Sequence, residues 1–94
     1  METPFFSALD FKTRDAHQSL RAEAFYSNGT HVSVTIGPST LCESMRTPYE
    51  LCFLWTPDYR QRDEPIYNLT AYEVDQLIAE AVALPLSAPK GKKP

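Results

Sequence analysis

The segment from Thr70 to Pro85 constrains the fold most, because it combines a helix start, an apolar stripe and a stop signal. Thr70 and Glu73 match a Thr-x-x-Glu capping box, in which each side chain accepts the backbone amide hydrogen of the other residue. Leu69 and Val74 occupy the hydrophobic-staple positions that flank this box. The pattern predicts a helix that begins directly after Thr70.

One face of this helix is apolar. A helix of roughly thirteen residues is marginal alone in water, so we expect the stripe to be held against a sheet. Asp75, Gln76 and Glu80 lie mostly off the stripe, and Pro85 ends the helix. Apolar residues recur at spacings of three and four, at Val74, Leu77, Ile78, Ala81 and Val82.

A β-hairpin is predicted around Asn28-Gly29, and its register follows from the faces of its strands. A two-residue loop would pair Glu23 with Val34 and place a carboxylate on the apolar face. A three-residue loop over 27–29, with Gly29 in the left-handed conformation of a G1 bulge, avoids this. We therefore predict the longer loop, which pairs Leu20 with Ile36, Ala22 with Val34, Ala24 with Val32 and Tyr26 with Thr30. The other face then carries Arg21, Glu23, Phe25, His31, Ser33 and Thr35.

A third strand is predicted over Tyr49–Trp55, where Tyr49, Leu51, Phe53 and Trp55 share one face. Both faces become apolar toward its end, which indicates a central strand or one beneath another element. Thr40–Glu43 matches a second capping box, but an irregular loop fits it equally well.

The first twenty residues are ambiguous. Phe5, Ser7, Leu9 and Phe11 alternate weakly, so we expect an N-terminal strand and then a loop, in preference to a short helix from Thr13.

The fold class predicted from these elements is α+β, with a small antiparallel sheet of three or four strands and one C-terminal amphipathic helix packed on one face. Ninety-four residues allow one core, so we expect a single domain over residues 1–86 and a basic flexible tail over 87–94. Neither a signal peptide nor an apolar run of about twenty residues is found, which predicts a cytoplasmic protein without membrane contact.

The charge is unevenly distributed. The chain carries a formal charge of −3, but three of its nine basic residues lie in the tail, so six basic and twelve acidic residues leave the body at −6. An acidic body repels nucleic-acid phosphates. We therefore expect a larger protein with a basic surface as partner and no direct nucleic acid binding, with the chain as a monomer or a homodimer formed by strand addition.

Few residues suit catalysis or ligand binding. Cys42 and Cys52 lack the spacing of a zinc site and are expected to be small buried thiols, with a disulfide or a reactive thiol as the lesser alternative. His17 and His31 are expected at the surface, and no glycine-rich phosphate loop is present. We predict no catalytic residue, no metal site and no cofactor.

The proline-bounded segment 55–67 is the strongest candidate for partner binding, because Trp, Tyr and Arg dominate binding hot spots. The alternatives are local ion pairing and the packing of Trp55 and Tyr67 beneath the helix. The predicted partner-binding residues are Trp55, Asp58, Tyr59, Arg60, Arg62, Asp63 and Glu64.

These observations predict a non-enzymatic, small, acidic protein-binding or inhibitory module. In size, acidity and lack of catalytic residues alone, the chain resembles the small inhibitors that phages and mobile elements encode, anti-CRISPR proteins among them. That resemblance implies inhibition of a host defence complex through its basic surface. The alternative is a small-ligand-binding or enzymatic domain with a pocket between sheet and helix, using Cys42 or Cys52.

Overall fold

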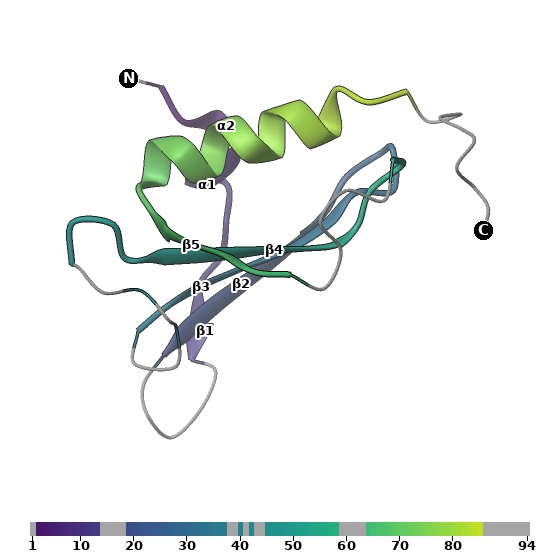
Figure 1. The fold of residues 1–94 in the computed structure, drawn as a ribbon. Helices are drawn as coiled ribbons and strands as arrows, with labels where there is room; N and C mark the ends of the chain where they lie inside the picture. The colour runs from purple at the N-terminus through teal and green to yellow at the C-terminus, as the bar shows by residue number, and fades with distance from the viewer. Residues whose placement is uncertain are drawn as a thin grey trace.

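The computed structural model describes residues 2–13, 19–37, 40, 42, 45–58 and 64–85. A short helix α1 (Pro4–Ser7) precedes five strands, and a longer helix α2 (Ala71–Val82) follows them. The strands form one antiparallel sheet in chain order: β1 (Lys12–Thr13), β2 (Leu20–Phe25), β3 (His31–Ile36), β4 (Tyr49–Trp55) and β5 (Ile66–Leu69). The α+β prediction is confirmed, with five strands where three or four were expected. The sheet is one layer and both helices lie together on one side of it (Figure 1).

The hairpin between β2 and β3 has the predicted three-residue loop. The Tyr26 amide donates to the Thr30 carbonyl (2.9 Å), and the Gly29 amide donates to the Tyr26 carbonyl (2.9 Å). Gly29 has a φ of +92°, the left-handed conformation that a G1 bulge requires. The predicted strand pairs are present, with Ala22 opposite Val34 and Ala24 opposite Val32.

Strand β4 has the predicted bounds and lies inside the sheet, between β3 and β5. The predicted alternation fails at Trp55. A bulge in the β3–β4 pair sets Trp55 opposite His31 and Phe53 opposite Val32, which leaves Leu54 as the extra residue. Trp55 therefore leaves the face that Phe53 occupies, and its ring lies over Gly29, where an added Cβ would be 2.7 Å from Cζ3.

The core lies between the sheet and α2, as the apolar stripe predicted. Val74, Ile78 and Ala81 are fully buried on the helix, and Leu77 and Val82 pack at the edge of the core. Burying a Val, Leu, Ile or Phe side chain stabilises the fold by about 1.5–3 kcal/mol. The sheet contributes Val32, Val34, Leu51, Phe53 and Leu69 to this core.

Both ends of α2 match the sequence. The Thr70 amide donates to Glu73 Oε1 (2.8 Å), and the Glu73 amide donates to Thr70 Oγ1 (3.1 Å), which completes the predicted capping box. The helix ends at Val82, ahead of Pro85. The apolar residues of the stripe are buried as predicted, but Asp75, expected mostly off the stripe, is also buried at 2% exposed.

The expected N-terminal strand over residues 5–11 is wrong. Residues 4–7 form α1, and only Lys12 and Thr13 join the sheet. Phe5 and Phe6 are adjacent apolar side chains, and burial on the same side of the sheet stabilises both. In α1 the Phe5 ring contacts Tyr26 (5.9 Å between centroids) and the Phe6 ring contacts Tyr49 (5.0 Å). In an extended strand these successive side chains would point to opposite faces of the sheet.

Two further predictions fall mostly on residues outside those described. In the possible capping box at 40–43, the described residues Thr40 and Cys42 are not helical, and the Thr40 hydroxyl donates to the Gly37 carbonyl (2.9 Å). The basic tail over 87–94 lies outside the described residues.

The uncovered face of the sheet as candidate binding site

Because both helices pack on one side, alternate residues of β2, β3 and β4 point to the opposite side of the sheet. Strand register arranges them in rows: Arg21 is opposite Thr35, which is opposite Glu50. The next row joins Glu23, Ser33 and Cys52. We call this surface the uncovered face, and it consists of Arg21, Glu23, Phe25, His31, Ser33, Thr35, Glu50, Cys52 and Leu54.

One ion pair on β2 and side-chain contacts between β2 and β3 organise the polar groups of this face. Arg21 Nη2 lies 2.7 Å from Glu23 Oε2, and Arg21 Nε donates to Ser33 Oγ (2.8 Å). His31 Nε2 lies 3.2 Å from Glu23 Oε1. The Arg21 charge is thus matched within the face by Glu23, and the guanidinium is held in a fixed direction.

An aromatic residue stands at one corner of the uncovered face. Phe25 is 71% exposed, and its ring stacks on the His31 imidazole at 3.9 Å between centroids and 22° between planes. Most of the apolar Phe25 side chain is therefore in contact with water, and a partner protein could cover it. Aromatic side chains of this kind are enriched at protein interfaces.

A hollow of about 240 Å³ opens on the same face. Its floor includes Ser33 and Thr35, which keep only 7% and 4% of their surface exposed although they point away from the core. Leu54 and Pro65 contribute apolar surface to the lining of the hollow. The described residues that line it are Arg21, Ser33, Thr35, Glu50, Cys52, Leu54 and Pro65.

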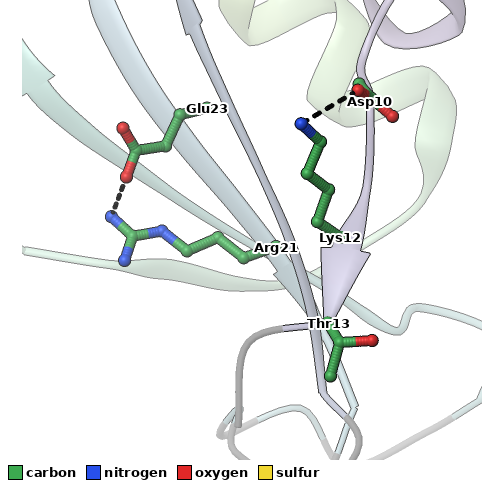
Figure 2. A pocket seen from close by; sticks show the side chains of 5 residues that line it. All are labelled: Asp10, Lys12, Thr13, Arg21 and Glu23. Carbon is green, nitrogen blue, oxygen red and sulfur yellow. Dashed lines mark ion pairs between the residues drawn. The ribbon is translucent and has the colours of Figure 1, made fainter.

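A second hollow of about 420 Å³ shares Arg21 with the first and reaches the edge strand β1. Figure 2 shows its five lining residues and two ion pairs, Arg21 with Glu23 and Lys12 with Asp10. The Lys12 and Asp10 side chains are 78% and 81% exposed at a separation of 3.6 Å, so their attraction is weak in water. Two adjacent hollows therefore leave the uncovered face uneven and polar.

Of the seven residues predicted to bind a partner, Trp55, Asp58 and Glu64 are described, whereas Tyr59, Arg60, Arg62 and Asp63 lie outside the described residues. Trp55 is half-buried, and Asp58 and Glu64 are exposed. Asp58 Oδ1 accepts a hydrogen bond from the Thr56 hydroxyl (2.9 Å).

The alternative that Trp55 and Tyr67 pack beneath the helix does not hold. Neither residue belongs to the core, and Tyr67 keeps 43% of its surface exposed.

The sequence predicted the uncovered face as the hydrated side of the hairpin, with an exposed Phe25 as a hint of an obligate oligomer, and did not predict the hollow. Ser33, Thr35 and Glu50 look like ordinary solvent-facing strand residues in the sequence. Their place around one hollow depends on the pairing of three strands and on the bulge at Leu54. The signal that could have found them is the strand alternation once β3 and β4 are paired.

The two cysteines are free thiols and half-buried, so they are less enclosed than expected. Cys42 Sγ donates to the Tyr49 carbonyl (3.3 Å) and accepts from the Asn68 amide (3.3 Å), which ties the start of β4 to β5. Cys52 lines the smaller hollow. His17 lies outside the described residues.

Within the described part of the chain, no group of three or more His, Cys, Asp or Glu side chains could hold a metal ion. No helix among those same residues is long and apolar enough to span a bilayer. Comparisons with protein-family models, curated proteins and solved structures find no match.

Proposed function

We propose that this chain is a non-enzymatic protein-binding module that acts by docking the uncovered face of its sheet on a larger partner. The observation that carries the proposal is Phe25, a phenyl ring that is 71% exposed and shares with a polar hollow the sheet face opposite both helices. An exposed aromatic anchor with polar groups around it has the composition of a binding hot spot.

The segment predicted to bind a partner adjoins this face. Trp55 is paired with His31 at the corner that carries Phe25, and Pro65 lines the smaller hollow. Trp55 and Pro65, the described residues at the two ends of this segment, therefore both lie beside the uncovered face. We propose that the segment and the face together contact one partner.

The charge of the body supports a basic partner. A body at −6 attracts a positively charged surface and repels nucleic-acid phosphates. Occupying such a surface would be enough to inhibit a larger complex, which is the mode of action that the class resemblance implies. We include inhibition of a host defence complex in the proposal on that basis alone.

Affinity purification from the native host with mass spectrometry tests the proposal, using the wild-type chain, Phe25→Asp and Tyr72→Asp. Tyr72 is a matched control, because it is an aromatic residue 39% exposed on α2, in the helical layer. We expect one partner to be retained by the wild type and by Tyr72→Asp in a salt-sensitive manner and lost with Phe25→Asp. Equal retention by a folded Phe25→Asp variant would contradict the proposal.

The alternative, a small-ligand-binding or enzymatic domain, predicts a different result. Its pocket would lie between sheet and helix, where Phe53, Leu51 and Ile78 are at most 1% exposed. A small-molecule panel that raised the melting temperature, with no protein partner captured, would favour this alternative.

A further inference from the structure

Two polar side chains of the smaller hollow lack partners among the described residues. Thr35 is 96% buried, yet its hydroxyl makes no hydrogen bond in the described part of the chain. Glu50, opposite Thr35 on β4, is half-buried and has neither an ion pair nor a side-chain hydrogen bond there. Buried polar groups nearly always have a partner, so the Thr35 hydroxyl points to one supplied from outside, and Glu50 lies beside it to contact the same group.

The charge balance of the hollow indicates the sign of that outside group. Arg21 is the cation in the lining, but Glu23 lies 2.7 Å from it and Ser33 accepts its Nε hydrogen. Among the described residues in and beside the hollow, the charges of Arg21, Glu23 and Glu50 add to −1, and Glu50 is the one without a counter-ion. The hollow is therefore suited to a cation with hydrogen-bond donors.

The walls indicate the shape of the ligand. Leu54 and Pro65 supply apolar surface beside the polar floor, and the hollow measures about 240 Å³. Arginine and lysine combine an aliphatic stem with a cationic head, and their stems pack readily on apolar surface. A single side chain of this kind satisfies both parts of the lining.

We propose that the hollow lined by Thr35, Glu50 and Leu54 receives the side chain of an arginine or lysine of the partner protein. Glu50 is its counter-ion, the Thr35 hydroxyl accepts one of its hydrogens, and Leu54 packs on its stem. This inference rests on the proposed function and names the chemical group on the partner that the uncovered face recognises. A carboxylate with a charged donor makes a stronger hydrogen bond than two neutral groups do.

Amide chemical-shift mapping of the ¹⁵N-labelled full chain tests the inference with N-acetyl-arginine amide, N-acetyl-lysine amide and N-acetyl-citrulline amide. Citrulline is the matched control, because it keeps the shape of arginine without the charge. We expect saturable shifts at Thr35, Glu50 and Leu54 with at least one cationic amide, and binding weaker by about tenfold or more with citrulline. Equal binding of the citrulline amide, shifts confined to other residues, or no shifts at all would overturn the inference.

Two variants sharpen this test. Glu50→Gln removes the charge at nearly constant shape and should weaken binding of the cationic amide by about tenfold, since it removes the counter-ion. Glu2→Gln, an exposed carboxylate next to α1, should leave binding unchanged. Unchanged binding by Glu50→Gln would overturn the inference.

The same variants separate this inference from the proposed function. Partner capture that is lost with Phe25→Asp but unaffected by Glu50→Gln would leave the protein-binding proposal standing and remove the role of the hollow. Partner capture that is unaffected by Phe25→Asp would count against the proposed function, whether or not the cationic amides bind to the hollow.

Discussion

The side-chain amide of Asn28 donates a hydrogen bond to the Ala81 carbonyl at 2.8 Å, which links the β2–β3 turn to the last turn of α2. The same nitrogen reaches the carbonyls of Val82 (3.3 Å) and Leu84 (3.2 Å), while Asn28 Oδ1 accepts the Thr30 amide hydrogen (3.0 Å). The last carbonyls of a helix have no partner within it, so the hairpin turn supplies a cap for α2. Asn28 is 6% exposed, which makes the contact costly to lose.

We predict that Asn28→Asp lowers the free energy of unfolding by about 2 kcal/mol, because it removes the side-chain donor that the Ala81, Val82 and Leu84 carbonyls share. The carboxylate keeps the acceptor for the Thr30 amide and adds a negative charge at the C-terminal end of the helix dipole, which is unfavourable. Urea denaturation measures the change. Ser27→Asp is the control, since it places the same charge on an exposed residue of the same turn. An equal loss in both variants would contradict the capping role.

The capping box at the start of α2 supports a second prediction. Thr70→Ala should lower the free energy of unfolding by about 1 kcal/mol, because the Glu73 amide loses its acceptor. Glu73→Ala removes the reciprocal bond to the Thr70 amide. Since the two bonds hold one turn, the double variant should lose less than the two single losses together. Denaturant midpoints for all three variants test this, and strict additivity would show that the two halves act independently.

The elements that could be predicted from the sequence are those with local determinants. The hairpin register could be predicted from Gly29 and from the requirement that apolar residues of the two strands share one face. Helix α2 could be predicted from its capping box and from its apolar stripe, which includes Val74, Ile78 and Ala81. In both cases the residues that decide the structure lie within a few positions of one another.

The elements that could not be predicted depend on residues far apart in the chain. α1 is short and has no side-chain cap from Thr3, so its stability is not visible in residues 4–7 alone. Its cap is Asp75, an acidic residue that the helix pattern placed off the buried stripe. The lining of the hollow was missed for the same reason, because Thr35 and Glu50 come together only through the pairing of β3 with β4.

Asp75 holds α1 against α2. Its Oδ1 atom accepts the amide hydrogens of Phe5 (2.7 Å) and Phe6 (2.9 Å), and the residue is 2% exposed. These are the amides that an N-cap side chain would satisfy, so a residue of α2 caps α1.

We predict that Asp75→Ala lowers the free energy of unfolding by about 3 kcal/mol, because two buried amides lose a charged acceptor. Asp75→Asn keeps an acceptor oxygen and should lose less. Hydrogen exchange at Phe5 and Phe6 should accelerate in the alanine variant more than exchange at Val32 in the core. Gln76→Ala, at the neighbouring exposed position, is the control and should leave both amides protected. Protection of Phe5 and Phe6 that survives Asp75→Ala would exclude the capping role.

Tyr26 lies next to this cap, with its ring 5.9 Å from that of Phe5. Burial of the phenol raises the pKa of Tyr26 above its ordinary value near 10, and the Asp75 carboxylate raises it further. Both causes favour the neutral phenol in the folded chain. The unfolded chain therefore loses the Tyr26 proton at a lower pH than the folded chain does.

The sign of the pH dependence follows from this order of ionisation. The contribution of Tyr26 to stability is fully present below the pKa of the unfolded state, about 10, and declines as pH rises through the higher pKa of the folded state. We predict that urea midpoints of the wild type fall more steeply in this alkaline range than those of Tyr26→Phe, which has no phenol to ionise. Tyr72→Phe, on the more exposed surface of α2, is the matched control and should follow the wild type. Parallel alkaline profiles for the wild type and Tyr26→Phe would show that Tyr26 ionises equally easily in both states.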